Sequence, residues 1–271
     1  MTDTIGIVAV VTVYHPDKQL LKRSILSMKE TVDRIILWRN SNEDLTEIES
    51  LSPKIILMGS GQNEFIASPF NRVLEWCKAH GYKYLLTMDQ DSVWENLYGF
   101  VRKVLDIKSE DIAIVAPNIN NDFNKEADIV EPETVITSGS LIDVDVALKI
   151  GGFNEKYQIY WVDGEFCYKA RLNGYKIKML TRFRLIHKFG EQKRTLFGFK
   201  TSNYSPIVYY YMIRNMLWEH RQYGNKAVSN RCIAYTLFYI VRGIILGEKN
   251  KFRKLYGIGT GIKHGLFKSY R

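Results

Sequence analysis

Short apolar runs alternate with amphipathic stretches along the first 120 residues. The run Ile5–Val13 is apolar and rich in β-branched side chains, which is typical of a strand buried on both faces. Pro16 ends this run, and Lys18–Thr31 then repeats apolar residues at helical spacing. Further strands are predicted at Arg34–Trp38, Lys54–Met58, Tyr82–Met88 and Ile112–Ala116, and a further helix at Pro69–Ala79. This succession predicts an α/β fold with a mostly parallel sheet and helices on both faces.

The pattern changes after residue 133. Thr134–Thr137 has the composition of a strand, and Val144–Ile150 and Trp161–Leu172 have helical spacing with glycines after each. Pro206–Tyr223 and Asn230–Leu246 predict two helices of an appended region. We therefore expect a main α/β domain over residues 1–200 and a helical, basic C-terminal region over residues 201–271.

Composition narrows the class of protein. The chain has 271 residues, of which 46% are hydrophobic, and this is enough for a sizeable core and speaks against wholesale disorder. Its three cysteines lie far apart and favour reduced thiols in a cytoplasmic protein. The first residues lack the basic start and the cleavage site of a signal peptide. No apolar stretch reaches the roughly 20 residues that cross a bilayer, so we expect no transmembrane helix.

Positive charge is concentrated in the last third of the chain. From Lys176 onward there are 20 lysines and arginines against three acids, whereas the first 175 residues carry 18 bases and 26 acids. A region this basic favours an anionic partner. The aromatic segment Tyr204–Tyr223, the apolar helix after it and Lys249–Lys254 favour docking on an anionic membrane surface. A plain core helix is the main alternative, and a nucleic-acid surface is the least favoured one.

Two carboxylates directly follow the predicted strand Tyr82–Met88. Asp89 and Asp91 are one residue apart at its open end, and ligands of such sheets bind beyond the carboxyl ends of the strands. Two neighbouring carboxylates repel each other unless a cation lies between them. Oxygen ligands suit Mg²⁺ or Mn²⁺, which would also bind a substrate phosphate. The alternative is an ordinary surface turn, because the D-x-D pattern is common in loops.

Asp163 and Glu165 form a second acidic pair, at the start of a predicted helix. The helix dipole favours carboxylates there, so a plain N-terminal cap is one interpretation and a general base is the other. His187 follows the strand-like run Phe183–Ile186. A lone histidine is more often packed or solvated than a ligand, but basic residues on both sides of this one are compatible with anion binding. The sequence has no Walker A loop and no strand–GxGxxG–helix unit, which argues against a P-loop NTPase or a nicotinamide enzyme.

Taken together, these motifs resemble the family 2 glycosyltransferases with the GT-A fold, and most closely their rhamnosyltransferase-like branch. The segments that carry the resemblance are Thr12–Pro16, Asn63–Gly81, Leu86–Ser92, Thr137–Ser140, Gly151–Phe153, Val162–Arg171, His187 with Gly190, Tyr209–Asn215 and Gly261–Gly265. Each match alone is modest, but their common order is specific. The resemblance implies a Rossmann-like sheet flanked by helices.

The resemblance also implies roles for individual residues. The residues that would contact the nucleotide-sugar donor are Thr12, Tyr14, Asn40, Asn71, Asp89, Ser138 and Gly139. The ligands of Mg²⁺ or Mn²⁺ would be Asp89, Asp91 and His187. Asp163 would be the catalytic base, and Glu165 would orient the acceptor or the base.

The implied activity is inverting transfer of one sugar, with dTDP-L-rhamnose as the expected donor. The acceptor would be a saccharide or a lipid-linked saccharide in bacterial surface polysaccharide synthesis, on the inner face of the plasma membrane. Arg39 stands where the family has an aspartate, and Tyr160 stands where the branch often has one. Both departures concern the donor more than the reaction. The alternatives are the same fold with a UDP-hexose donor and a non-catalytic scaffold that binds nucleotide sugars or membranes.

Overall fold

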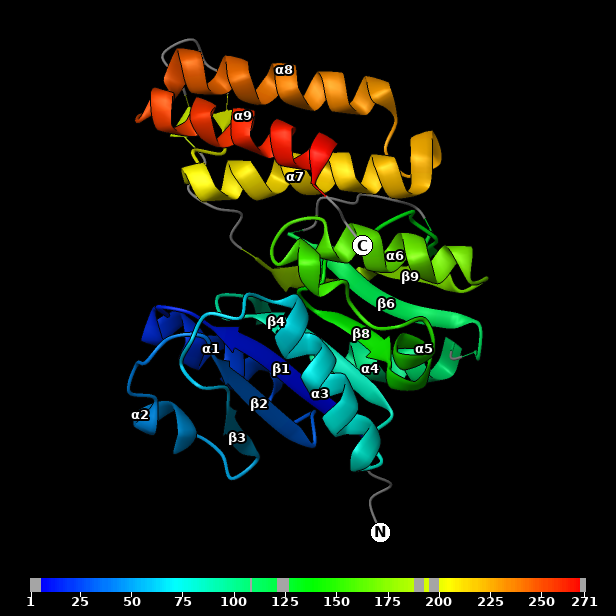
Figure 1. Cartoon of the computed structure of the whole chain (residues 1–271). Helices are drawn as coiled ribbons and strands as arrows, with labels where there is room; N and C mark the ends of the chain where they lie inside the picture. The colour runs from blue at the N-terminus through cyan, green and yellow to red at the C-terminus, as the bar shows by residue number, and fades with distance from the viewer. Residues whose placement is uncertain (1–5, 108, 121–126, 188–192, 195–199, 269–271) are drawn as a thin grey trace. The chain divides into compact units, whose positions relative to one another are not determined.

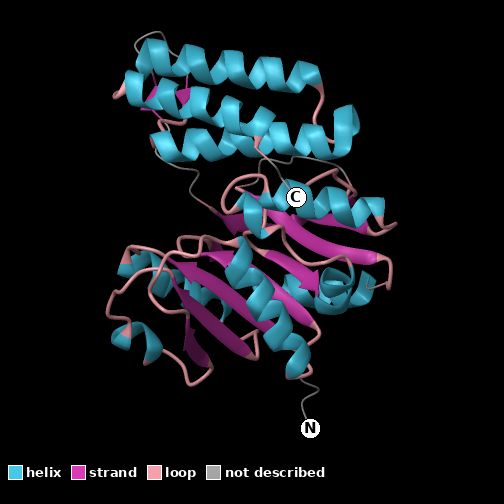
Figure 2. Ribbon diagram, viewed as in Figure 1, coloured by secondary structure: helices cyan, strands magenta, loops and turns pink. Residues whose placement is uncertain are grey.

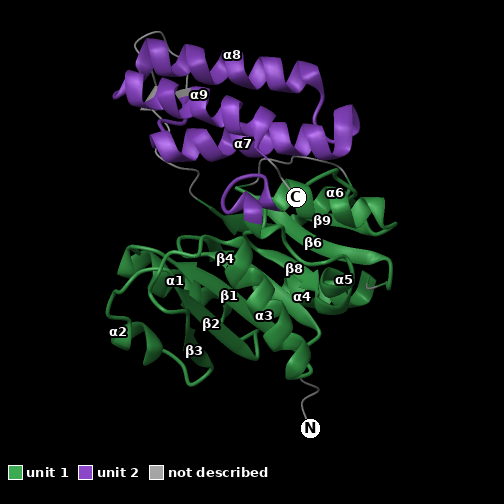
Figure 3. Cartoon of the chain, viewed as in Figure 1, with its two compact units in different colours: residues 1–155, 163–188 green, residues 156–162, 189–271 purple. Residues whose placement is uncertain are grey.

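The computed structural model describes residues 6–107, 109–120, 127–187, 193–194 and 200–268 (Figure 1). The chain divides into two compact units (Figure 3). Unit 1 comprises residues 1–155 and 163–188, and unit 2 comprises residues 156–162 and 189–271. Unit 2 therefore includes a short segment from the middle of the chain, which ends directly before Asp163.

Unit 1 is built on one mixed sheet (Figure 2). Its strands within the described ranges are β1 (Ile7–Val13), β2 (Arg34–Arg39), β3 (Ile55–Met58), β4 (Tyr84–Asp89), β5 (Val93–Trp94), β6 (Ile112–Ile119), β7 (Ile129–Val130), β8 (Ser140–Asp143) and β9 (Lys176–Ile186). Their order is β3-β2-β1-β4-β8-β6-β9-β5, with β7 beside β9. β1 is parallel to β2 and β4, and β6 is parallel to β9, whereas β8 runs antiparallel between β4 and β6. The predicted, mostly parallel sheet is confirmed.

Helices cover both faces of this sheet, as predicted. The helices of unit 1 are α1 (Lys18–Met28), α2 (Thr46–Glu49), α3 (Ala67–Ala79), α4 (Leu97–Ile107), α5 (Val144–Lys149) and α6 (Val162–Leu172). Side chains from β1, α1 and α4, such as Ile7, Ile25 and Phe100, share one buried cluster. Helix α3 crosses the opposite face and contacts α5 (Figure 1). Both faces of β1 are therefore buried, which explains its unbroken apolar sequence.

Local sequence signals explain where several helices begin and end. Helix α1 begins after Asp17, whose carboxylate accepts hydrogen bonds from the backbone N–H groups of Gln19 (2.9 Å) and Leu20 (3.2 Å). Helix α3 ends before Gly81, which has a φ of +75° that glycine adopts without strain. The predicted ends of these two helices lie within three residues of the observed ones.

The strand predicted at Thr134–Thr137 is wrong, because the strand of this region, β8, begins only at Ser140. The hydroxyl group of Thr87 on β4 donates hydrogen bonds to the carbonyl groups of Thr137 and Ser140. The backbone N–H of Ser140 donates to the carbonyl of Thr137 at 3.0 Å and closes a turn. The β-branched composition predicted that this backbone pairs with a neighbouring strand. Its carbonyl groups instead accept hydrogen bonds from the Thr87 side chain.

Unit 2 contains three long helices within its described residues, α7 (Pro206–Tyr223), α8 (Asn230–Gly247) and α9 (Lys251–Phe267), and a short pair of strands, β10 (Lys193–Arg194) and β11 (Lys200–Thr201). Helices α7 and α8 match the prediction. Helix α9 was missed because its four glycines lower helix propensity. Three of them face α7 at four-residue spacing, and a Cβ at Gly257 would lie 2.5 Å from the carbonyl oxygen of Pro206. Glycine here allows two helices to pack closely.

The core of unit 2 is formed between its helices. Buried side chains from α7, α8 and α9, such as Ile213, Ile244 and Ile258, form one cluster, and Trp161 packs against it. Within the ranges that the structure describes, no helix combines the length and the apolar character that a membrane span requires.

Candidate active site

The ends of β1 and β4 lie side by side at one edge of the sheet. Thr12 is the register partner of Asp89, the last residue of β4, and Asp91 lies two residues further in the following turn. Parallel pairing brings the carboxyl ends of the two strands to the same edge. This is the edge at which open α/β sheets bind their ligands.

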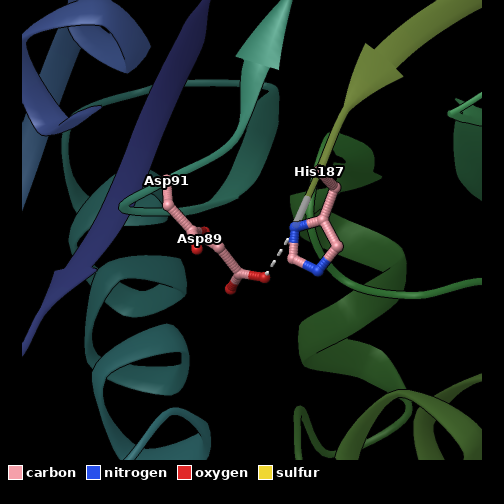
Figure 4. A group of neighbouring side chains, drawn as sticks. All are labelled: Asp89, Asp91 and His187. Carbon is pink, nitrogen blue, oxygen red and sulfur yellow. Dashed lines mark ion pairs between the residues drawn. The ribbon is translucent and has the colours of Figure 1, made fainter. Parts of the chain in front are cut away.

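Asp89, Asp91 and His187 form one cluster at this edge (Figure 4). One ligand atom from each side chain lies within 4.8 Å of the others, and Asp89 Oδ2 is 3.6 Å from His187 Nδ1. His187 directly follows β9, so the fold joins two distant parts of the sequence. Two carboxylates and an imidazole are a donor set that suits Mn²⁺ and also accommodates Mg²⁺. The residues present therefore fit a divalent cation.

Two serines support this cluster. Ser92 Oγ lies 2.8 Å from His187 Nδ1 and 2.7 Å from Ser138 Oγ, and both serines are buried. Ser138 Oγ also accepts a hydrogen bond from the backbone N–H of Asp89 at 3.1 Å. Because Ser92 contacts Nδ1, it fixes the orientation of the imidazole ring. A hydrogen bond of this kind sets which ring nitrogen can act as a ligand.

Asn120 fixes the backbone of His187. The backbone N–H of His187 donates to Asn120 Oδ1 at 2.9 Å, and Asn120 Nδ2 donates to the carbonyl oxygen of His187 at 2.7 Å. No sequence motif predicted a role for Ser92 or Asn120. Ser92 could have been found from its place beside the paired aspartates, whereas the local sequence gives no signal for Asn120. Gly190, the second half of the expected His187 motif, lies outside the described residues.

Burial and nearby charges shift the acidity of two carboxyl groups. Desolvation raises the pKa of Asp89 to about 6; His187 opposes this shift, whereas the charges of Asp91 and Asp163 add to it. Desolvation also raises the pKa of Asp163. The backbone N–H of Gly164, which donates to Asp163 Oδ1 at 2.9 Å, lowers this pKa but does not cancel the rise. Because the charge of Asp163 acts on Asp89, the two acidic motifs of the sequence share one electrostatic environment.

Glu165 has different surroundings from Asp163, although both lie in the first turn of α6. The Glu165 carboxylate is buried, and its Oε2 lies 3.4 Å from Lys169 Nζ. Lys169 Nζ also donates to the carbonyl oxygen of Gly152 at 2.6 Å. Glu165 therefore lies beside Lys169, whereas the charge of Asp163 acts on Asp89.

Comparisons with known proteins bear on the fold of the chain. No protein-family model matches the chain. A curated protein similar to it is the dTDP-rhamnosyl transferase RfbF of Shigella flexneri, with 24% identity over 274 residues that cover 91% of this chain and 90% of the relative. A solved structure of GalNAc-T7 with UDP, GalNAc and Mn²⁺ matches with a TM-score of 0.61 at 12% identity, over 99% of this chain and 57% of that one. S. aureus TarS with UDP-GlcNAc matches with a TM-score of 0.59 at 13% identity, over 96% of this chain and 81% of that one.

The chain has the GT-A fold. The resemblance to the family 2 glycosyltransferases that the motifs indicated is confirmed by these comparisons, and the curated relative matches along nearly the full length of both chains. The match to GalNAc-T7 covers just over half of that protein's chain. Three of the predicted donor contacts, Thr12, Tyr14 and Ser138, lie at the same edge of the sheet as the acidic cluster.

Gln90 joins the acidic turn to the end of β1 in this GT-A sheet. The backbone N–H of Tyr14 donates to Gln90 Oε1 at 2.9 Å, and Gln90 Nε2 donates to the carbonyl oxygen of Tyr14 at 3.1 Å. The Tyr14 side chain is 47% exposed. An accessible aromatic ring therefore stands beside the acidic turn, where the sequence predicted a contact with the nucleotide.

Asn40 and Asn71, also predicted donor contacts, each hold a loop of the GT-A unit. Buried Asn40 donates to the carbonyl of Phe65 at 2.6 Å and accepts from the N–H of Glu64 at 3.0 Å. Asn71 donates to the carbonyl of Phe153 at 2.8 Å and accepts from its N–H at 2.7 Å. Both amide groups are engaged within the protein, so the structure gives them a part in fixing the two loops.

Gly139, next to Ser138, makes a close approach that excludes a side chain. It has a φ of +79°, and its N–H donates to the carbonyl of Thr87 at 2.7 Å. A Cβ at this position would lie 2.7 Å from Leu185 Cδ2. Glycine is therefore required for the turn that places Ser138 against the backbone of Asp89.

Proposed function

We propose that the chain is an inverting, metal-dependent glycosyltransferase that moves L-rhamnose from dTDP-rhamnose to a saccharide or lipid-linked saccharide acceptor. The observation that carries this proposal is the cluster of Asp89, Asp91 and His187 on a GT-A fold, with Asp163 in the same electrostatic environment. Sugar transfer from a nucleotide diphosphate needs stabilisation of the departing pyrophosphate and a base for the acceptor hydroxyl. This site offers candidates for both.

The metal ligands, Ser92 and Asp163 would have separate parts in this reaction. Bound Mn²⁺ or Mg²⁺ would neutralise negative charge on the departing diphosphate, with Asp89, Asp91 and His187 as its ligands. Ser92 holds the His187 ring in the orientation that ligation requires. Asp163 takes the proton from the acceptor hydroxyl while that oxygen bonds to the anomeric carbon from the face opposite the diphosphate. The bond between the anomeric carbon and the diphosphate breaks, and its electron pair goes to the phosphate oxygen.

The raised pKa of Asp163 suits this base. Desolvation raises the pKa of Asp163 and makes its carboxylate a stronger proton acceptor than an exposed aspartate. A nucleoside diphosphate is a good leaving group, so one base suffices and the acid–base pair of a glycosidase is not needed.

The donor is proposed from the relatives. The S. flexneri relative is a dTDP-rhamnosyl transferase, whereas TarS was solved with UDP-GlcNAc and GalNAc-T7 with UDP. A UDP-hexose is therefore the second candidate. We would measure nucleoside diphosphate release from dTDP-rhamnose, UDP-glucose and UDP-GlcNAc, with and without Mn²⁺, in the presence of lipid-linked saccharides. Mn²⁺-dependent release and a product heavier by one deoxyhexose support rhamnosyl transfer, and a hexose increment supports the second donor. No release from any donor would favour the scaffold alternative.

We further propose that unit 2 docks on an anionic membrane through one side of α8. The side chains of this α8 face recur three or four positions apart and are Tyr235, Phe238, Tyr239, Arg242, Ile245 and Leu246. All of them are exposed except Arg242, which is half-buried with its guanidinium 5.8 Å from the centre of the Phe238 ring. An apolar face with aromatic residues and a basic residue is suited to the lipid interface.

Charge around this face favours anionic lipid. Between Asn230 and Lys268 the chain has eight lysines and arginines and a single acid, Glu248. Glu248 is buried, and its Oε2 lies 2.7 Å from Lys254 Nζ. The exposed charge of this segment is therefore entirely positive, and each such residue near an anionic bilayer contributes about 1 kcal/mol of attraction. Docking of this kind would hold the enzyme at the cytoplasmic face of the plasma membrane, beside lipid-linked acceptors.

Vesicle sedimentation tests this docking. The full chain should sediment with vesicles that contain phosphatidylglycerol and not with pure phosphatidylcholine, and salt should weaken the binding because it screens the charges. Equal binding to both vesicles, or binding to neither, would contradict the proposal. A concentration-dependent dimer without vesicle binding would instead identify the α8 face as a contact between two copies of the chain.

A further inference from the structure

The segment that leads into Asp163 has an unusual backbone. Within the described residues, eight non-glycine residues have positive φ, and three of them fall between residues 158 and 161: Gln158 (+60°), Tyr160 (+64°) and Trp161 (+63°). This left-handed conformation is unfavourable for residues with a Cβ, especially aromatic ones. It persists only where the surroundings hold it in place, and such strain gathers at functional sites. The segment belongs to unit 2 and ends at Trp161, two residues before Asp163.

Asn215 on α7 binds three carbonyl groups of this segment. Its Nδ2 lies 2.7 Å from the carbonyl oxygen of Tyr157, 2.9 Å from that of Ile159 and 2.7 Å from that of Tyr160. The Asn215 side chain is fully buried, with 0% exposure. Two of these carbonyls flank Gln158 and the third belongs to Tyr160, so one amide group fixes the backbone on both sides of Gln158 and at Tyr160.

Arg214 completes this contact and holds Asn215 in its orientation. Arg214 Nη2 donates to the carbonyl oxygen of Lys156 at 2.7 Å, and Arg214 Nε donates to Asn215 Oδ1 at 2.9 Å. The guanidinium carbon lies 4.1 Å from the centre of the Trp218 ring and 4.7 Å from that of Tyr211. A planar guanidinium between aromatic rings is fixed in a way that an ammonium group is not.

These contacts come from one side of a single helix. One face of α7 carries Tyr211, Arg214, Asn215, Trp218 and Glu219, which are three or four residues apart or adjacent. Glu219 Oε2 on this face accepts a hydrogen bond from the buried hydroxyl of Tyr157 at 2.8 Å. Such a network is specific only when each of its polar groups is satisfied.

We propose that Arg214 and Asn215 are positioning residues that hold the strained segment 157–161 and thereby fix the place of Asp163. This inference rests on the proposed role of Asp163 as the base. The two residues act through the backbone, because their side chains bind the segment itself. The metal ligands and the donor-side turn come instead from β1, β4 and β9 of unit 1. Loss of the Asn215 amide should therefore slow proton transfer and leave binding of donor and cation unchanged.

The experiment compares Asn215→Ala with wild type in the full chain. We expect kcat for sugar transfer to fall about 10- to 100-fold, because small misplacement of a reacting group has effects of this size. The donor KM and the Kd for Mn²⁺ should stay within about threefold of wild type. Binding to phosphatidylglycerol vesicles serves as a check that unit 2 is folded. Arg214→Lys, which keeps the charge but loses the planar donor group, should show the same separation of kcat from KM and covers the case in which Asn215→Ala does not fold.

The matched control is Arg221→Gln on the same helix. Arg221 Nη1 also donates to backbone carbonyls, those of Gly265 at 2.8 Å and Lys268 at 2.9 Å, but both lie at the end of α9 rather than in segment 157–161. This variant loses bonds of the same kind and should keep kcat within about twofold of wild type. An equal loss of kcat in Arg221→Gln and Asn215→Ala would show a general effect on α7 and would overturn the proposal.

A second substitution tests the role of backbone strain. Glycine adopts positive φ without a penalty, so Gln158→Gly in the Asn215→Ala background should recover about three- to fivefold of the lost kcat. A purely structural loss elsewhere in α7 would not respond to this change. Folded Asn215→Ala and Arg214→Lys proteins with wild-type kcat, or with donor KM altered as much as kcat, would refute the positioning role while the proposed function stands. A wild-type chain that transfers no sugar from any donor would overturn both.

Discussion

Units 1 and 2 use polar and apolar side chains in opposite ways. In unit 1 the apolar strands are buried, and two carboxylates and a histidine gather where β4 and β9 end. In unit 2 most charged residues are basic, and apolar side chains face outward. Of the fifteen large hydrophobic residues that are exposed in the described part of the chain, ten belong to unit 2. If unit 2 docks on a membrane as we propose, sugar transfer and docking should be separate properties, which single substitutions remove one at a time.

The largest expected effect is the loss of the base in unit 1. Asp163→Asn keeps the shape of the side chain but cannot accept the proton, so kcat should fall about 10³-fold, within the range for general base catalysis. Donor affinity by calorimetry and vesicle binding should stay unchanged. Asp145→Asn, which alters an acid in the first turn of another unit 1 helix, is the control and should retain activity. Lost donor affinity with intact turnover in Asp163→Asn would refute the assignment.

The next effect concerns unit 2 alone. Phe238→Ser combined with Ile245→Ser should weaken binding to phosphatidylglycerol vesicles about 30-fold, because each side chain loses part of the roughly 1.5–3 kcal/mol that its burial in an apolar phase supplies. Nucleoside diphosphate release with a soluble acceptor should persist. Tyr98→Ser, in unit 1, is a matched control because Tyr98 is 64% exposed and Phe238 is 65% exposed. Unchanged vesicle binding in the double variant would show that membrane contact lies elsewhere.

A smaller effect on Mn²⁺ affinity is expected when the hydrogen bond between Ser92 and His187 is removed. Ser92→Ala removes the hydroxyl group that contacts His187 Nδ1, and it should weaken Mn²⁺ binding about tenfold, as loss of outer hydrogen bonds does at metal sites. Ser50→Ala removes a hydroxyl that bonds the carbonyl of Glu47 on α2 and should have no such effect. Titration calorimetry with Mn²⁺ measures both. Equal affinity in the two variants would mean that Ser92 does not orient the histidine.

The smallest effect near neutral pH is the pH dependence of cation binding. Because desolvation raises the pKa of Asp89 to about 6, protons compete with the cation at a higher pH than they would at an exposed aspartate. Affinity for Mn²⁺ should be full above pH 7, lower by about twofold at pH 6 and by about tenfold at pH 5. A constant affinity over this range would contradict the raised pKa of Asp89.

Most of the fold could be predicted because burial on both faces leaves a continuous apolar pattern. β1 and β4 were found from such runs, and α7 and α8 from helical spacing. Helix α9 was missed because its close packing on α7 requires the glycines that hide it in the sequence. The strand expected at Thr134–Thr137 was wrong because the Thr87 side chain, distant in sequence, bonds this backbone. Both errors come from tertiary contacts.

The candidate site divides in the same way. Asp89 and Asp91 could be placed because they directly follow a strand, and position along a parallel sheet settles where ligands bind. The approach of His187 to these carboxylates depends on the pairing of β9, and its orientation depends on Ser92 and Asn120. The engagement of the Asn40 and Asn71 amides with loops also follows from contacts far apart in sequence. Such contacts cannot be predicted from the composition of the chain or from the spacing of its motifs.

The central proposal is that Asp89, Asp91 and His187 would hold one divalent cation, which would offset the negative charge of the donor's pyrophosphate. Electron paramagnetic resonance of Mn²⁺, titrated with the full chain in the presence and absence of dTDP, tests it most directly. We predict one bound Mn²⁺ per chain, tighter binding with dTDP or another nucleoside diphosphate, and a loss of about 100-fold in affinity in Asp91→Asn but none in Asp145→Asn. Equal Mn²⁺ binding by wild type and Asp91→Asn would contradict the account.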